Sequence, residues 1–176
     1  TTDQRNWKLG DIYHSEMAIV GPPKAIDTEL AGDTNTEEYF KLQNGYQAFI
    51  DANASRDTII YVGANDGMLH AFKDSNDDKG EELWGFIPPN VLPKLRSMFS
   101  GVEGVTNPIY GVDGSAVVKD IFLSGQWRTV LMAGLGREGY GYFALDVTNP
   151  LSPSFLFAFE NDPQNEVIRH WASNGT

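Results

Sequence analysis

Two segments of the chain repeat the same order of short apolar runs, and this repeat constrains the fold more than any other feature. The run LWGF, which starts at Leu83, matches LFAF, which starts at Leu156, 73 positions later. The dipeptides 71–72 and 144–145, Ala-Phe and Ala-Leu, are separated by the same 73 positions. A repeat at a fixed period is typical of an array of similar structural units.

The first unit is centred on a β-hairpin, YVGANDGMLHAF, over residues 61–72. The run at 58–63 is rich in β-branched and aromatic residues, and the run at 68–72 alternates behind the turn, as expected for strands. Between them, Asn65-Asp66-Gly67 supplies residues that tolerate the positive φ angles of hairpin turns. With the aromatic strand expected at 82–87, this unit covers about 56–88.

The second unit covers about 114–160. Four short strands are expected there, over 115–123, 129–134, 139–146 and 154–159. Short strands separated by glycine suggest a sandwich, a barrel or a propeller, and the repeat favours the propeller. We therefore predict a mainly β fold, with blades that are antiparallel four-stranded sheets.

The remaining segments connect or precede these units. One or two short strands are expected within 11–23, followed by an acidic loop over 25–36. Apolar residues at helical spacing predict one helix over about 37–52, capped by Thr34 together with Glu37, and a shorter helix lies near 91–98. Two blades cannot close a ring, so we expect residues 1–176 to be one domain that forms the first part of a larger propeller.

Charge and composition exclude several classes of partner. The formal net charge is -11, from 24 acidic and 13 basic residues, so we expect repulsion from phosphate backbones and no nucleic-acid binding. No apolar run approaches the length of a transmembrane helix, so no membrane span is expected. The chain has no cysteine, which excludes disulfides and thiol chemistry within it.

Five segments, in this order, resemble one known family. They are GDIYHS from Gly10, YVGANDGMLHAF from Tyr61, GEELWGFIPP from Gly80, YGVDGSAVVKD from Tyr110 and GLGREGYGYFALDVTNP from Gly134. Together they closely resemble the C-terminal propeller of the PilY/PilC family of type IV pilus biogenesis factors, from about Gly10 to Phe159. The resemblance implies an exported, non-enzymatic protein at the pilus tip, the outer membrane surface or in the periplasm. It also implies assembly with minor pilins and adhesion, with host-cell receptors as further candidate partners.

The same hairpins are similar to pyrroloquinoline-quinone repeats, which makes the predicted blades quinoprotein-like. Ala71, Asp74, Gly80 and Trp84 fit that repeat with an insertion. A quinone-dependent dehydrogenase is therefore the alternative enzyme hypothesis. However, this chain lacks the neighbouring cysteines on which several such enzymes stack their cofactor. Only four residues suggest a quinone site: Asn65, Asp66, Asp113 and Arg137. A second alternative, an outer-membrane assembly scaffold with the same repeats, needs a lipidated cysteine.

One acidic segment has the spacing of a calcium loop. Asp74, Asn76 and Asp78 alternate as EF-hand ligands do. However, Lys79 stands where that loop needs glycine, and Gly85 stands where it needs the bidentate glutamate. An acidic hairpin tip without metal is the favoured interpretation. Some members of the PilY/PilC family carry a calcium loop further downstream. The resemblance therefore implies calcium in the full-length protein, and no cofactor is expected in this segment.

Other candidate motifs carry little chemistry. His14, His70 and His170 are too scattered to predict a metal site, and we expect His70 to pack within a strand. The segment GLGREG at 134–139 precedes a strand instead of a helix, which favours a bulged hairpin over a phosphate loop. No nucleophile motif is present, so no catalytic residue is predicted. Three loops are expected to be contact surfaces: 25–36, 74–81 and 100–108.

Overall fold

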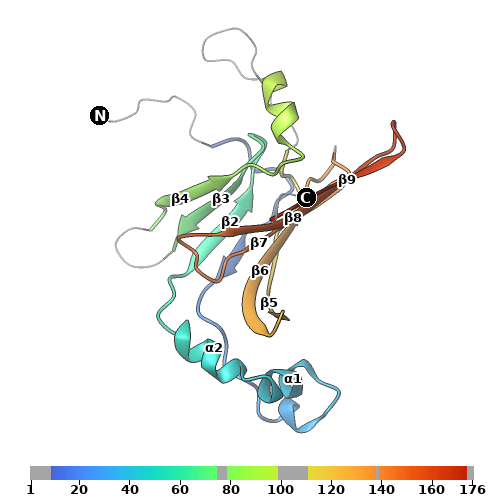
Figure 1. Ribbon diagram of the computed structural model, residues 1–176. Coiled ribbons are helices and arrows are strands. Elements are labelled where there is room, and N and C mark those ends of the chain that lie inside the picture. The colour runs from blue at the N-terminus through green and yellow to red at the C-terminus, as the bar shows by residue number, and fades with distance from the viewer. Residues whose placement is uncertain (1–8, 75–78, 99–110, 138, 174–176) are drawn as a thin grey trace.

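The computed structural model describes residues 9–74, 79–98, 111–137 and 139–173, and its strands form two antiparallel sheets (Figure 1). The first sheet has the order β1-β2-β3-β4. Its strands are β1 (Ala18–Val20), β2 (Ile59–Gly63), β3 (Leu69–Lys73) and β4 (Glu82–Phe86). The second sheet has the order β5-β6-β7-β8-β9. Its strands are β5 (Val117–Leu123), β6 (Gln126–Gly134), β7 (Gly141–Asp146), β8 (Ser154–Asp162) and β9 (Val167–Ala172). The predicted mainly β fold is confirmed.

Strands β2-β3-β4 and β6-β7-β8 are two copies of one hairpin unit. The register between β3 and β4 shifts between Ala71 and Phe72, and the register between β7 and β8 shifts between Ala144 and Leu145. A bulge of this kind bends a strand and increases its twist. Because both sheets carry the bulge at matching positions, the sequence repeat is also a repeat of backbone geometry.

The second sheet differs from the expected four strands by one additional strand. β9 pairs antiparallel with β8 along its whole length, from Phe157 opposite Ala172 to Asp162 opposite Val167. The turn that leads into β9 places Glu166 at a φ of 55°. Its sequence, VIRHWA, lacks the apolar alternation that predicts a half-buried strand, and most of its side chains are exposed.

A helical arm, defined here as residues 25–56, connects β1 to β2 and extends beyond the ends of both sheets (Figure 1). It contains the short 3-10 helix η1 (Leu30–Gly32) and two helices, α1 (Glu37–Gln43) and α2 (Tyr46–Ala52). The single helix predicted over 37–52 is therefore divided, because Gly45 adopts a φ of 69° and caps α2. The predicted cap at Thr34 is wrong. Thr36 caps α1, and its side chain accepts a hydrogen bond from the Tyr39 amide at 3.1 Å.

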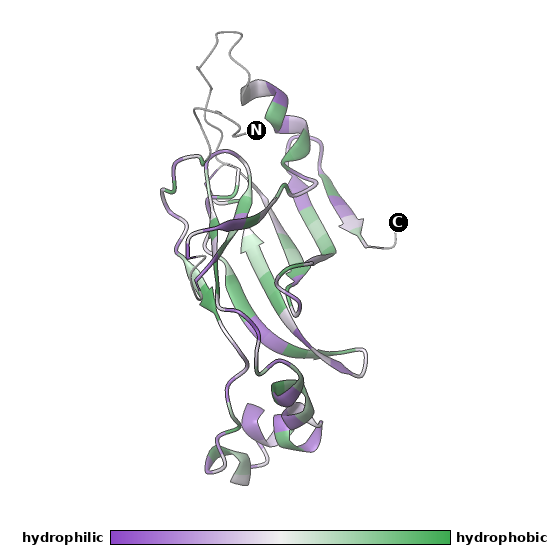
Figure 2. Cartoon of the chain, turned by 90° about the vertical axis from the view of Figure 1, so that its left-hand side faces the viewer, coloured by the Kyte–Doolittle hydropathy of each residue, from purple (hydrophilic) through white to green (hydrophobic). Residues whose placement is uncertain are grey.

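The hydrophobic core lies between the facing sides of the two sheets. Buried side chains come from both sheets and from the segments between them: Ile59, Tyr61, Leu69 and Ala71; Leu131, Ala133, Phe143 and Leu145; Val91 and Val112. Phe86 of the first sheet contacts Phe143 of the second, with ring centroids 5.4 Å apart. Apolar stretches run along these strands, whereas the arm mixes apolar and hydrophilic residues (Figure 2). Burial of this shared core is the main term that holds the sheets together.

The segment 111–114, Gly-Val-Asp-Gly, forms the joint between the two hairpin units. A side chain at Gly111 would lie 2.3 Å from the Cα of Gly67, in the first hairpin turn. A side chain at Gly63 would lie 2.1 Å from the carbonyl oxygen of the buried Val112. Glycine is therefore required here because backbone passes directly against backbone.

Another short helix follows the first sheet. The 3-10 helix η3 (Leu92–Met98) occupies the segment where a helix near 91–98 is expected. It begins after a turn in which the amide of Val91 donates to the carbonyl of Pro88 at 2.9 Å. Val91 itself is fully buried, so this turn anchors η3 to the core.

Candidate functional site

The acidic segment considered as a calcium loop is only partly described. Asp74 forms an ion pair with Lys79, with Oδ1 and Nζ 3.4 Å apart. Asn76 and Asp78 lie outside the described residues, as does the loop 100–108. Within the described ranges, no group of three or more His, Cys, Asp or Glu side chains could hold a metal ion.

The three histidines lie in three separate environments. His14 contacts Asp113 of the joint, with Nδ1 and Oδ2 2.6 Å apart. His70 is fully buried in the first sheet, as expected for a packed strand residue. His170 is exposed on β9. Each has its own neighbours, so they do not form one site.

His70 lies between two carboxylates. Its Nε2 is 3.0 Å from Oδ2 of Asp66, and its Nδ1 is 2.7 Å from Oε1 of Glu82. Burial alone disfavours the charged ring, but the hydrogen bonds and attraction from the two carboxylates outweigh it, so the pKa of His70 is raised. Burial also opposes ionisation of Asp66, yet the hydrogen bonds from His70 and from the Gly10 amide lower the pKa of that carboxyl. The three groups connect the hairpin turn to β4.

The four residues considered for a quinone site act as structural contacts or lie at the surface. Asp66 accepts a hydrogen bond from the Gly10 amide at 2.9 Å, and Asp113 accepts one from the His14 amide at 3.1 Å. The backbone N–H of Asn65 donates to the backbone carbonyl of Asp11 at 2.8 Å. These three contacts fasten the segment before β1 onto both hairpin units. Arg137 is exposed in the turn before β7, where Gly136 adopts a φ of 76°.

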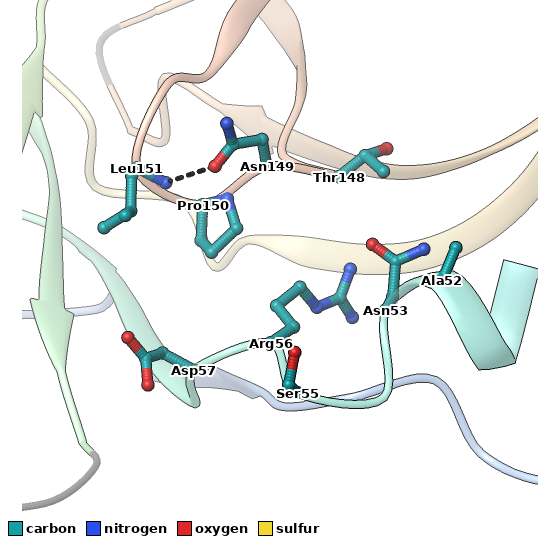
Figure 3. A pocket seen from close by; sticks show the side chains of 9 residues that line it. All are labelled: Ala52, Asn53, Ser55, Arg56, Asp57, Thr148, Asn149, Pro150 and Leu151. Atoms are coloured by element: carbon teal, nitrogen blue, oxygen red, sulfur yellow. Dashed lines mark hydrogen bonds between the residues drawn. The ribbon is translucent and has the colours of Figure 1, made fainter.

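A pocket of ≈ 300 Å³ lies where the arm returns to the first sheet (Figure 3). It is lined by two segments, 52–57 and 148–151. The guanidinium of Arg56 beside it is already engaged, because it donates to the Gly21 carbonyl and to the Thr129 hydroxyl, the latter at 2.7 Å. The Nε, Nη1 and Nη2 atoms of Arg56 are therefore already hydrogen-bonded within the fold.

Arg56 belongs to a polar network that joins the arm to the second sheet. The Thr129 hydroxyl, which accepts from Arg56, donates to Oδ1 of Asp120 at 2.6 Å. The Tyr46 hydroxyl donates to the other oxygen of Asp120. Burial lowers the pKa of Arg56, while burial and the hydrogen bond to Asp120 raise the pKa of Tyr46. The three hydrogen bonds, from Arg56 to Thr129, from Thr129 to Asp120 and from Tyr46 to Asp120, hold the arm against the second sheet. The polar groups of this network therefore have a structural role.

An aromatic cluster covers this network at the outer end of the arm. Phe40 of α1 lies 5.9 Å from both Phe122 of β5 and Trp127 of β6, measured between ring centroids. Trp127 also contacts Tyr46, with centroids 4.7 Å apart, and its Nε1 donates to the Asn44 carbonyl at 2.8 Å. We name the exposed part of this cluster, Phe40 with Phe122 and Leu123, the aromatic tip. It combines apolar exposure with a rigid base.

Sequence reasoning did not find the aromatic tip. The acidic loop 25–36 was expected to be a contact surface, but the aromatic tip is formed by α1 and the β5–β6 hairpin. The only signal was the density of aromatic residues at 39–49 and 122–127. Their convergence depends on contacts across 83 positions of sequence, such as that between Trp127 and Asn44.

Two antiparallel sheets, stacked face to face and built from a repeated bulged hairpin, define part of a β-propeller. A model of the PilY1 beta-propeller domain matches residues 9–169. The chain therefore belongs to the PilY1 beta-propeller domain family.

Several relatives are known as type IV pilus biogenesis factors. The type IV pilus biogenesis factor PilY1 of Pseudomonas aeruginosa PAO1 is 40% identical over 164 residues, which are 93% of this chain and 13% of that protein. A PilY1 homolog of Xylella fastidiosa is 41% identical over 154 residues, or 87% of this chain and 12% of that protein. The chain thus spans about an eighth of the length of these relatives.

The crystal structure of the P. aeruginosa PilY1 C-terminal domain has a similar fold. It superposes with a TM-score of 0.60 at 36% identity, covering 83% of this chain and 26% of the crystallised chain. No helix in the described ranges is long and apolar enough to cross a membrane. The structural match is consistent with the two sheets being part of a larger propeller.

Proposed function

We propose that this chain is the first part of the propeller of a type IV pilus biogenesis factor and contributes a rigid surface for assembly. The observation that carries the proposal is membership of the PilY1 beta-propeller family over residues 9–169, together with the repeated blade geometry. The whole segment 1–176 is then one domain, and the remaining blades come from a longer protein.

The proposal includes partners and a location. The protein acts outside the cytoplasm, at the pilus tip, the outer membrane surface or in the periplasm. Its partners are minor pilins, and adhesion to host-cell receptors is a further role. Support comes from the names of the relatives, which are pilus biogenesis factors, and from a rigid scaffold that carries an exposed arm.

A non-enzymatic role fits the contacts of the candidate residues. Asp66, Asp113 and Arg56 use their polar atoms to connect segments of the fold. Any calcium would bind elsewhere in the complete protein. The alternative of a quinone enzyme predicts cofactor absorbance and reduction of an artificial electron acceptor, and the alternative of an outer-membrane scaffold predicts normal pili in its absence.

The test is to delete the gene in its host and to count surface pili by electron microscopy, with twitching motility as a second readout. The proposal predicts loss of pili, restored by the full-length gene and not by a gene that lacks residues 10–159. Because such a deletion also opens the ring, Gly111→Ala, which disturbs the joint alone, should give a partial loss. Normal pili and motility after gene deletion would contradict the assembly role.

A further inference from the structure

Two groups of exposed apolar side chains, both on or beside the second sheet, are candidate contact surfaces. One group lies on the outward face of the second sheet, where Met132 pairs with Val117 and Tyr142 pairs with Gly134. In a propeller such a face is covered by the next blade. The other group, the aromatic tip, lies where α1 meets the end of β5, at the end of the second sheet that is next to the arm (Figure 1). Stacking of further blades onto the sheet faces would leave the aromatic tip uncovered.

The aromatic tip is apolar and rigid. Phe40 is 46% exposed and Phe122 is 36% exposed. Beneath them, Trp127 is fixed by its hydrogen bond to Asn44, and Tyr46 is 2% exposed and hydrogen-bonded to Asp120. Aromatic side chains that are held in place before binding lose little conformational entropy, which is why they often dominate the energy of interfaces.

The arm around the aromatic tip is acidic. Residues 25–52 contain six acidic residues and one basic residue, Lys41. Glu37 and Glu38 pair with Lys41, and Glu37 also pairs with Lys119. The other four carboxylates belong to Asp27, Glu29, Asp33 and Asp51, and no ion pair within the described part of the chain involves them. A partner at this end of the molecule therefore meets apolar rings surrounded by excess negative charge.

We propose that the aromatic tip is a docking surface for a cationic, amphipathic protein segment, with apolar side chains against Phe40 and Phe122 and Lys or Arg side chains toward the carboxylates of the arm. The inference rests on the proposed function in one respect, that the natural partner is a pilus subunit. An anionic membrane is repelled by the same carboxylates. Charge complementarity speeds association and makes it sensitive to salt, while the rings supply most of the affinity.

The binding test uses the full chain and a helical peptide of about 18 residues with a leucine face and a lysine face. Calorimetry should detect binding, and Phe40→Ser should weaken it about tenfold, as expected for loss of a central aromatic contact. Replacing the four carboxylates, as in Asp27→Asn and Glu29→Gln, should weaken binding and flatten its salt dependence. A matched peptide with glutamate in place of lysine should not bind.

A matched control lies on β9, at the edge of the second sheet opposite to β5. Ile168, 75% exposed on β9, is far from the arm in sequence, and Ile168→Ser should leave the peptide affinity unchanged. Leu123→Lys is the second variant at the aromatic tip and should also weaken binding if Phe40→Ser fails to fold. Loss of affinity in Ile168→Ser, with unchanged affinity in Phe40→Ser and Leu123→Lys, would overturn the proposal. Equal binding of the glutamate peptide would also overturn it.

A cellular test separates this inference from the proposed function. In a host that carries the full-length gene with Phe40→Ser, surface pili should decrease although the protein level is unchanged. Normal pili in this strain, with pili lost after gene deletion, would overturn the docking surface and leave the assembly role intact. Normal pili after gene deletion would overturn the assembly role itself.

Discussion

Ala71 and Ala144 occupy the same place in the two sheets. Both are buried, and in each case the pairing with the following strand shifts register immediately after the alanine. Trp84 lies opposite Ala71 and Phe157 lies opposite Ala144, so a small residue faces an aromatic residue in both sheets. A larger side chain at either alanine would displace its aromatic partner, and the two positions should respond alike to substitution.

The glycine joint predicts a steep cost for a single methyl group. Gly63→Ala places a Cβ atom 2.1 Å from the carbonyl oxygen of Val112, which cannot move without shifting the joint. We expect the free energy of unfolding to fall by about 1–3 kcal/mol, the usual range for overpacking. Urea denaturation of the purified chain measures this change. Gly32→Ala, where no atom lies within 4 Å of the new methyl group, is the matched control and should change stability little.

The polar network predicts that the arm depends on one hydroxyl group. Thr129→Val keeps the side-chain shape but removes the acceptor for Arg56 and a donor to Asp120. Because both charged partners are partly buried, we expect a loss of about 2–3 kcal/mol in the free energy of unfolding. Thr28→Val, at an exposed position of the same arm, provides the comparison. Equal stability of the two variants would show that the network does not hold the arm.

The carboxylates around His70 predict a stability maximum in mildly acidic solution. The pKa of His70 is raised above 6.5, so its contribution is complete below that pH and is lost as the pH rises through the folded-state value. The pKa of Asp66 is lowered below 3.8, so its contribution is complete above that pH and is lost on stronger acidification. Urea denaturation from pH 3 to pH 9 should therefore show greatest stability between these two limits.

Variants assign this pH dependence to His70. Glu82→Gln, which removes the carboxylate at Nδ1, should weaken the loss of stability on the alkaline side, and His70→Gln should abolish it. His170→Gln, at an exposed position, should behave as the unmodified chain. An alkaline slope that persists unchanged in His70→Gln would assign the effect to another group.

The acidic segment predicts no response to calcium in this part of the protein. Lys79 already pairs with Asp74, and the EF-hand positions for glycine and glutamate hold Lys79 and Gly85. We expect millimolar calcium to leave the melting temperature of the chain unchanged, apart from general salt effects. A saturable rise in melting temperature that disappears in Asp74→Asn would instead establish a site at Asp74, Asn76 and Asp78.

Local patterns predicted much of the fold. The β2–β3 hairpin was predictable because strand residues flank Asn65-Asp66-Gly67, and the turn indeed needs positive φ at Gly67. The repeat predicted two similar units because matching residues of the two hairpins lie 73 positions apart. The repeat also favoured a propeller over a sandwich or barrel, and the family resemblance added the family; the comparisons confirm both.

Features that depend on tertiary contacts were not predictable in the same way. The helix over 37–52 breaks at Gly45, where a left-handed residue allows α2 to turn and bury Tyr46 against β5 and β6. Most side chains of β9 are exposed and its apolar residues do not alternate, so only its pairing with β8 defines it. The aromatic tip combines residues from α1 and the β5–β6 hairpin, and no local pattern links these segments.

The most direct test of the central claim, that these two sheets are part of a larger propeller ring, is oxidative footprinting of Met132 by mass spectrometry. Met132 is 42% exposed on the outward face of the second sheet, so it should react readily in the isolated chain. In the complete protein the next blade should cover it and slow its oxidation strongly, while Phe40 of the aromatic tip keeps its reactivity. Equal oxidation of Met132 in the isolated chain and in the complete protein would contradict the claim.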